Sequence, residues 1–342
     1  MTRPLLIKIL IGVFLTAFII LLGSFNSGKP RILVLHSFSK DLPWCRYVDS
    51  GMQKVLKKNR IPVSVQWHYL DLDTSQNTGF QQNAVNEAFR AINRIKPDVL
   101  IAVDDESNGY VARNFAGKGS PKIVFVATLL PPEQYGYLKA GNVSGIVEKL
   151  PLDAVHDALL TALRGKTARI AVIGMDDDTG RAELAQVLSF NWAPHRLTLL
   201  QAHNNFAEWQ KFTLQAADQA DVLLVLSYDG LERGNGNHSL MPRAQIGEWI
   251  EKHSRALPLG ICQTFVEDGG GIGIAPAPLD FGQQAMEMAL NWIGAPKGAA
   301  PPPVSTSPHF RVGLRSSLLA ARGVVMPPIY IEAARIGNTY FP

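Results

Sequence analysis

The chain of 342 residues is 46% hydrophobic and 18% charged, which gives enough apolar material for a sizeable core and a length typical of two domains. Its formal net charge is +4, and the first 28 residues contribute Arg3 and Lys8 but no acid. The remaining 31 basic and 29 acidic residues form no dense basic stripe, so we expect no nucleic-acid partner. The two cysteines, Cys45 and Cys262, are too few for a disulfide framework, and we expect separate thiols.

Residues 1–28 have the pattern of an export signal. Arg3 and Lys8 precede an uncharged run of 14 residues, Ile9 to Leu22, which suits the apolar part of a signal peptide better than a full membrane span. The segment contains no Cys, which excludes lipoprotein processing. We expect a cleaved signal peptide, with an uncleaved N-terminal membrane anchor as the alternative. Both place the body of the protein in the periplasm or another extracytoplasmic space.

From Arg31 onward, short apolar strands alternate with segments in which apolar residues recur at helical spacing. Pro97 ends the second of these helices. This alternation predicts βαβ units and a parallel sheet. The expected strands are Ile32–Leu35, Val63–Trp67, Val99–Val103, Ile123–Ala127 and Asn142–Glu148.

The same plan repeats in the second half of the chain, with a final strand at Phe310–Leu314. We expect an α/β fold of two doubly wound parallel-sheet lobes joined by a hinge, with Asn142–Glu148 and Gly269–Ile274 crossing between them. The predicted first lobe comprises residues 29–145 and 273–300, and the second comprises 146–272 and 301–342. Further strands are expected at Ala168–Ile173, Leu197–Leu200, Val222–Leu226 and Leu259–Cys262.

Polar residues at the carboxyl ends of parallel strands are where open α/β sheets place ligand contacts. Ser37 and Phe38 follow the first expected strand, and a hydroxyl near a helix start suits an anionic or hydroxylated group. Trp44 lies in the same loop and can stack on a ring or cover the cleft. A core or hinge position for Trp44 remains the competing interpretation.

Acids follow two of the expected strands. Asp104 and Asp105 end a buried strand, and we expect one to cap a helix and the other to pair with a positive ligand group. Glu106 is expected to be exposed to solvent. Thr128 follows the next strand as a hydroxyl contact. In Met175–Thr179, three consecutive acids lack the spacing of a calcium loop, so helix capping is favoured over a metal site.

In the second lobe, the best contact set follows the strand Val222–Leu226. Ser227, Tyr228 and Asp229 offer a hydroxyl, an aromatic face and a carboxylate. Gln263 and Thr264 follow the next strand as further ligand contacts. The histidines do not cluster, and the chain has no G-x-S-x-G, H-E-x-x-H or P-loop motif, so we expect no enzyme activity, cofactor or metal site.

Several short segments occur in order along residues 31–330: Leu35–Phe38, Pro43–Trp44, Tyr69–Asp71, Lys96–Asp98, Asp104–Asp105, Val124–Val126 and Asn142–Glu148. In order and spacing they resemble the ABC-transporter substrate-binding proteins of the type I periplasmic-binding fold, in a largely uncharacterised branch. The resemblance implies an extracytoplasmic two-lobe protein that closes on a small solute. The chain departs from this family in lacking a lipobox Cys and in having Glu106–Ser107 where Asn-Ala usually follows the acid pair.

Three functions are consistent with these features. The leading one is a solute-binding protein that delivers a small organic ligand, with an amino-acid-like one favoured, to the permease and ATPase subunits of an ABC importer. The alternative is a sensor that presents its ligand-bound form to a membrane receptor or kinase. An exported enzyme is the third, and only the acid clusters support it.

Overall fold

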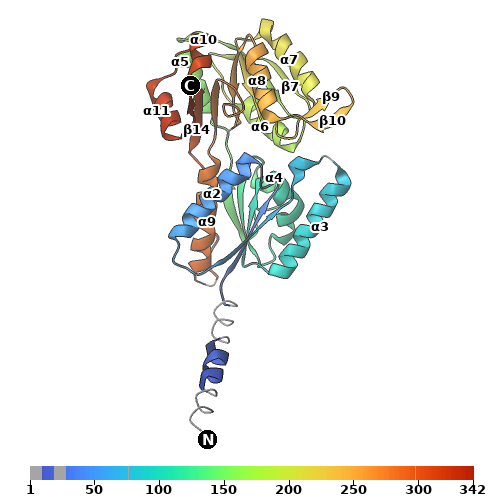
Figure 1. The fold of residues 1–342 in the computed structure, drawn as a ribbon, viewed down its shortest axis with the longest axis vertical. Helices are drawn as coiled ribbons and strands as arrows, with labels where there is room; N and C mark the ends of the chain where they lie inside the picture. Colours follow the sequence, from blue (N-terminus) through green and yellow to red (C-terminus); the bar gives the residue numbers. More distant parts are fainter. Residues whose placement is uncertain (1–9, 19–27, 76, 263, 297) are drawn as a thin grey trace.

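The computed structural model describes residues 10–18, 28–75, 77–262, 264–296 and 298–342. Residues 31–342 form two α/β lobes that follow one another along the long axis of the molecule (Figure 1). A helical segment covers residues 10–18; most of the predicted export segment and Gln263 lie outside the described residues. Among the helices of the described part, none is both long and apolar enough to span a bilayer.

The first lobe contains a six-stranded, fully parallel sheet in the order β13-β5-β4-β3-β1-β2. Apolar side chains alternate along its strands, so two cores form on opposite faces. One core packs against α2 (Pro43–Lys58) and α9 (Pro278–Gly294), and the other against α3 (Thr78–Ile95). The strands are β1 (Arg31–His36), β2 (Ser64–Tyr69), β3 (Val99–Val103), β4 (Lys122–Thr128), β5 (Val143–Val147) and β13 (Ser305–Thr306).

The second lobe contains a seven-stranded sheet in the order β15-β14-β12-β11-β8-β6-β7. Five strands are parallel, whereas β14 pairs antiparallel with β12, and β15 runs parallel to β14. The strands are β6 (Arg169–Gly174), β7 (Arg196–Ala202), β8 (Val222–Val225), β11 (Leu257–Gly260), β12 (Ile272–Pro276), β14 (Phe310–Arg315) and β15 (Tyr340–Phe341).

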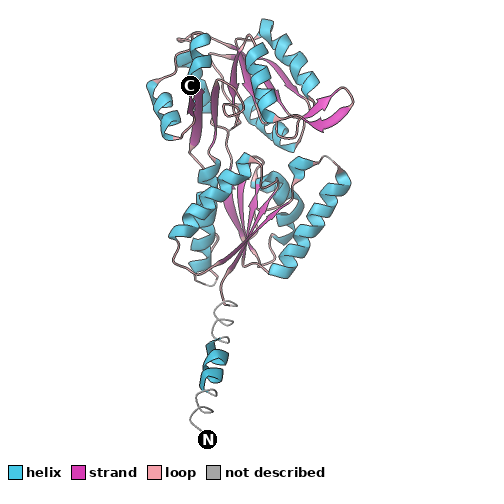
Figure 2. Ribbon diagram, in the orientation of Figure 1, coloured by secondary structure: helices cyan, strands magenta, loops and turns pink. Residues whose placement is uncertain are grey.

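Helices cover both faces of this second sheet as well. One face carries α7 (Phe206–Gln219) and α8 (Arg243–His253). A hairpin of β9 (Glu232–Gly234) and β10 (Asn237–Leu240) projects from the outer side of the lobe, as the magenta ribbon in Figure 2 shows. The other face carries α5 (Leu152–Ala162), α6 (Asp178–Ser189), α10 (Ser316–Ala321) and α11 (Pro328–Ile336).

The predicted fold class is confirmed, with three differences. The predicted final strand pairs antiparallel, and α10, α11 and β15 follow it, so the chain continues where no further element was expected. The structure also has the β9–β10 hairpin, whose two strands are not among the strands expected from the sequence. A short exposed hairpin buries little apolar surface, and its sequence therefore lacks a hydrophobic alternation.

The chain crosses between the lobes after β5, between β12 and α9, and between β13 and β14. Consequently β12 lies in the second sheet, although its residues 273–276 were assigned to the first lobe, and β13 lies in the first sheet. The returning helix α9 packs closely against α2 at Gly282. A Cβ atom at this position would lie 1.9 Å from the carbonyl oxygen of Val48, which is too short for a contact. Glycine at this position permits the close approach of the two helices.

Candidate functional site

A cavity of about 300 Å³ lies between the lobes, where the carboxyl ends of the two parallel sheets face each other. This volume suits a small solute, and sites between domains at strand carboxyl ends are a common place for ligands in α/β folds. Residues of both lobes line the cavity. Any molecule that fills it would therefore contact both lobes at once.

The structure brings most of the predicted site residues to this cavity. Those that line it are Phe38, Trp44, Asp104, Asp105, Ser227, Asp229 and Thr264. Three others, Ser37, Thr128 and Tyr228, are buried behind its wall. Gln263 lies outside the described residues.

Two of the three buried residues, Ser37 and Tyr228, make hydrogen bonds within the framework of the site. Ser37 Oγ donates to the carbonyl oxygen of Val103 and accepts from the backbone N–H of Ser107, both at 2.9 Å, which joins the ends of β1 and β3. Tyr228 donates to Asp268 at 2.6 Å. The Thr128 hydroxyl is buried and has no hydrogen-bond partner among the described residues. Sequence position at a strand end did not reveal which way these side chains turn.

Asp104 is a buried lining acid whose carboxylate accepts a single hydrogen bond. Its backbone adopts a left-handed conformation with φ of 69°, which Asp tolerates better than most residues. The indole N–H of Trp44 donates to Asp104 Oδ1 at 2.8 Å, whereas Oδ2 is buried without any partner in the described structure. Burial raises the pKa of Asp104 well above its usual value, and the nearby charge of Glu106 raises it further.

Asp105 has a different environment from its neighbour. Its carboxylate accepts hydrogen bonds from the backbone N–H groups of Leu129 and Leu130, both at 3.1 Å, and from the hydroxyl of Tyr135. Burial raises its pKa, while these hydrogen bonds oppose the rise. Asp105 therefore holds the loop after β4 in place.

Glu106 was expected to be exposed, and the structure contradicts this. The helical turn α4 (Asp104–Glu106) begins directly at the end of β3, so its three acids all line the cavity. Glu106 Oε2 is buried without a partner among the described residues, and Oε1 accepts a long hydrogen bond from Thr179 at 3.4 Å. Burial, together with the charge of Asp105, raises the pKa of Glu106 to about 8.

Sequence reasoning missed two further buried acids of the cavity. Glu148 directly follows β5, and no hydrogen bond to its carboxylate is present among the described residues. Burial raises its pKa well above the usual value, and the charges of Asp104 and Glu183 contribute. Together Asp104, Glu106 and Glu148 form the carboxyl cluster of the first lobe. Glu148 ends a predicted crossing strand, a signal that could have identified it.

In the second lobe, the carboxylates of Glu183 and Asp229 are paired with hydrogen-bond donors of the protein itself. Glu183, in the middle of α6, accepts from the backbone N–H of Ser227 at 3.0 Å and from its hydroxyl at 2.6 Å. Burial raises the pKa of Glu183 to about 7, although the two hydrogen bonds from Ser227 act to lower it. Asp229 pairs with Arg243 at 3.0 Å, and Arg243 also reaches Asp268 at 3.3 Å.

Two of the three consecutive acids predicted to cap a helix, Asp177 and Asp178, also line this cavity. Asp177 accepts from the backbone N–H of Gly180 at 2.7 Å as the cap of α6, in agreement with the prediction. Arg181 pairs with Asp176 and Asp178, each at 2.7 Å. Among the described residues, no group of His, Cys, Asp and Glu is arranged to hold a metal ion.

The described lining is strongly acidic. It contains two basic residues, Arg181 and Arg243, and each already pairs with two acids. The lining acids number nine: Asp73, Asp104, Asp105, Glu106, Glu148, Asp177, Asp178, Glu183 and Asp229. A positively charged ligand group is therefore favoured electrostatically over a negative one.

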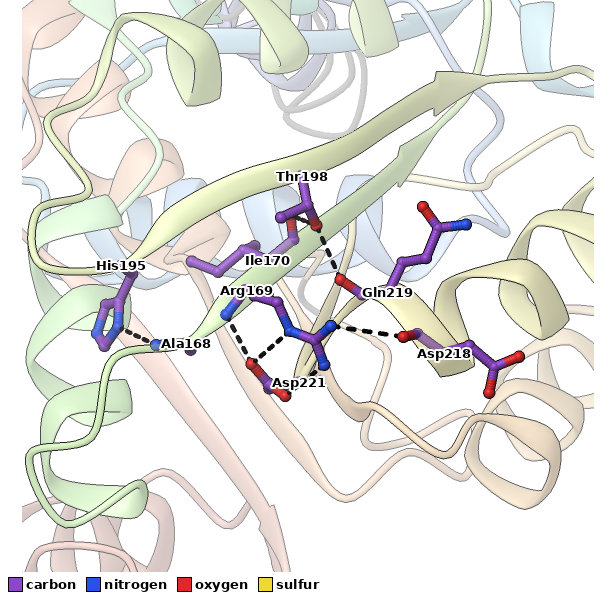
Figure 3. Close-up of polar contacts among 8 residues, drawn as sticks. All are labelled: Ala168, Arg169, Ile170, His195, Thr198, Asp218, Gln219 and Asp221. Carbon is purple, nitrogen blue, oxygen red and sulfur yellow. Dashed lines mark hydrogen bonds and ion pairs between the residues drawn. The ribbon is translucent and has the colours of Figure 1, made fainter.

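The opposite end of the second sheet shows ordinary structural charge pairing (Figure 3). Arg169 pairs with Asp221 at 3.0 Å, and both side chains are about half exposed. His195 Nδ1 accepts from the backbone N–H of Ala168 at 3.0 Å. Arg169 and Asp221 thus have both a partner and contact with water, in contrast to the unpartnered oxygens of the carboxyl cluster.

Comparison with known proteins rests on structure alone, because no family model and no curated protein matches the chain. A domain from Streptococcus pneumonia in complex with L-Trp superposes with a TM-score of 0.66 at 15% identity, over 90% of this chain and 98% of that one. A ligand-free, open substrate-binding protein from Clostridium difficile gives 0.64 at 18% identity, over 87% and 96%. A glucose-galactose binding protein from Geobacillus stearothermophilus gives 0.57 at 14% identity, over 84% and 98%.

The chain has the type I periplasmic-binding fold. Some of the structural neighbours are named as binding an amino acid, and others as binding a sugar. At this low sequence identity, the similarity supports the fold of this chain but does not indicate its ligand.

Proposed function

We propose that this protein is an extracytoplasmic solute-binding protein whose two lobes close on a small organic solute. The observation that carries the proposal is the cavity of about 300 Å³ formed by the carboxyl ends of both sheets. Because both lobes supply polar groups to it, a bound solute would favour the closed arrangement, which is the hinge motion of two-lobed binding proteins. The predicted residues Phe38, Trp44, Asp104, Ser227 and Asp229 would contact the solute.

The solute would carry a positive group, since carboxylates dominate the lining. An amino-acid-like solute, as expected from the sequence, presents an ammonium group that meets this requirement. The closed form would deliver its solute to the permease and ATPase subunits of an ABC importer, without enzyme activity. A membrane-bound sensor would use the same closure, and recovery of a receptor or kinase instead of a permease in a pull-down would favour it.

A thermal-shift screen tests binding itself. The panel comprises amino acids, amines, sugars, nucleosides and metal ions, each added to the wild-type protein and to Asp104→Asn. A solute at about 100 times its Kd adds about 2.7 kcal/mol to the stability of the folded state, which gives a measurable rise in melting temperature. We expect a rise with wild type that Asp104→Asn reduces. No rise with any class would contradict the proposed function.

A further inference from the structure

Buried oxygens of the carboxyl cluster lack hydrogen-bond donors. Asp104 is only 6% exposed, and its Oδ2 has no partner among the described residues. Glu106 Oε2 is also a buried atom without a partner there, although the Glu106 side chain as a whole is only half-buried. Glu148 is also 6% exposed and receives no hydrogen bond on its carboxylate from the described part of the chain. Buried polar atoms are nearly always satisfied in native proteins, so such orphaned acceptors at a cavity point to a missing donor.

We propose that the carboxyl cluster binds the ammonium or guanidinium group of an organic amine that carries no carboxylate. The proposal rests on the proposed function and names the class of solute. An ammonium group offers three N–H donors and no acceptor, and a guanidinium offers five donors. Either group would donate hydrogen bonds to the carboxyl oxygens of Asp104, Glu106 and Glu148. Its positive charge would also reduce the electrostatic repulsion between these acids.

The second lobe explains why the solute lacks a carboxylate. A solute carboxylate needs a cationic or N–H partner, and the two lining arginines are already engaged. Arg243 binds Asp229 and Asp268, and Arg181 binds Asp176 and Asp178. A carboxylate in this cavity would instead lie among a surplus of acids. Its burial would cost free energy that no unpaired arginine of the lining is available to offset. The zwitterion of a simple amino acid is thus a poorer match than its decarboxylated amine.

The remaining lining favours an organic cation over an inorganic one. Phe38, Trp44 and Tyr110 line the cavity together with aliphatic side chains, so it offers both apolar surface and aromatic faces. An alkyl or aryl stem would bury against this surface, and an aromatic face attracts a nearby cation. A bare metal ion would leave these groups uncovered, and the described acids do not converge as metal ligands.

Matched pairs of probes test this inference directly. Isothermal titration calorimetry of the full chain would compare agmatine with arginine, cadaverine with lysine, and tryptamine with tryptophan. The members of each pair differ only by the carboxylate. We expect at least one amine to bind, and to bind at least tenfold more tightly than its amino acid.

Charge-removing variants locate the binding group. Asp104→Asn and Glu148→Gln preserve side-chain size, and each should weaken the amine at least tenfold without lowering the melting temperature. Asp157→Asn is the matched control, because Asp157 has a 74% exposed side chain remote from the cavity lining, and it should bind like wild type.

Amino acids that bind as tightly as their amines, or variants that keep full affinity, would overturn the inference. Binding of a sugar or nucleoside in place of amines would overturn it too, while the proposed function would stand. If no probe of any class binds, the proposed function fails together with the inference.

Discussion

The two lobes share the order of five parallel strands, β5-β4-β3-β1-β2 in the first and β12-β11-β8-β6-β7 in the second, but differ in how they hold the charges that face the cavity. In the second lobe, Glu183 is held by Ser227, and Asp229 is held by Arg243. In the first lobe, oxygens of Asp104 and Glu106 are buried without donors. The difference shows that side chains of the second lobe already pair its acids, and it is the basis of our proposal that a ligand completes the first lobe. Substitutions in the two lobes should therefore affect different properties.

The largest effect on stability is expected from Arg243→Gln in the second lobe. This change leaves Asp229 and Asp268, whose side chains are 32% and 11% exposed, without their common cation, and partly buried acids that lose their cation destabilise the fold. Because the Arg243 side chain is 19% exposed, we expect the free energy of unfolding to fall by about 2–3 kcal/mol, below the value for a fully buried pair. Chemical denaturation measures this change.

The exposed pair at the far end of the same sheet provides the control. Arg169→Gln removes the ion pair with Asp221 (Figure 3), whose two side chains are about half exposed, and we expect no measurable change in stability. An Arg243→Gln variant as stable as Arg169→Gln would show that the second lobe does not depend on its paired charges.

The pH dependence of stability should report the unpaired acids of the first lobe. The pKa of Glu106 is about 8 in the folded protein, above its value in an unfolded chain, so the folded state binds more protons between these values. Its contribution to stability is therefore present at acidic pH and is lost as the pH rises through about 8. Each such group contributes a slope of up to about 1.4 kcal/mol per pH unit. The groups acting on Glu106 include Asp105, Asp177, Ser37 and Thr179.

Denaturation of the ligand-free protein at pH values from 5 to 8 measures this slope. We expect stability to fall with rising pH, and Glu106→Gln to flatten the fall. A wild-type stability that rises across this range would mean that the first-lobe acids are compensated in the free protein.

A smaller effect is expected from Ser227→Ala. Glu183 keeps its hydrogen bond from the backbone N–H but loses the hydroxyl donor at 2.6 Å, which should cost about 1 kcal/mol. Because this hydrogen bond lowers the pKa of Glu183, the pKa should rise further above about 7. Thermal denaturation and carbon-detected NMR titration measure the two changes. Ser50→Ala, on the exposed surface of α2, is the control, and an equal loss in both variants would argue against a preorganised Glu183.

The smallest effect concerns the contact between the lobes outside the cavity. Tyr47 on α2 donates to Glu267 at 3.2 Å, and the Arg311 guanidinium lies 4.7 Å from the centre of the Tyr47 ring. Tyr47→Phe keeps the ring and removes the hydrogen bond, so we expect denaturation to show a loss of about 0.5 kcal/mol. A loss above about 2 kcal/mol would mean that this contact, and not the individual lobe cores, dominates stability.

The sequence predicted the framework because each lobe alternates buried strands with amphipathic helices, a pattern that needs no tertiary information. Asp104, Ser227 and Asp229 could be predicted because they follow the expected strands. The structure shows that all three line the cavity. Glu183 and Arg243 were missed because they lie on helices, where only the three-dimensional packing shows which side chains turn toward the cavity.

The strand-end rule also has a limit at the residues that the structure buries. Ser37, Thr128 and Tyr228 lie at or just after strand ends, as Asp104 does, yet they are buried and do not line the cavity. Successive side chains at a strand end point in opposite directions, and a local turn decides which one faces the ligand. The left-handed backbone conformation of Asp104 produces such a turn, and no pattern in the sequence predicted it.

Small-angle X-ray scattering tests the central claim, that the lobes close on a solute held between them. The protein would be measured alone and with a saturating amount of the amine that binds most tightly in calorimetry. We predict a smaller radius of gyration in the presence of the amine, and no such change for Asp104→Asn under the same conditions. Scattering curves that stay identical while calorimetry shows a saturated site would contradict closure around the ligand.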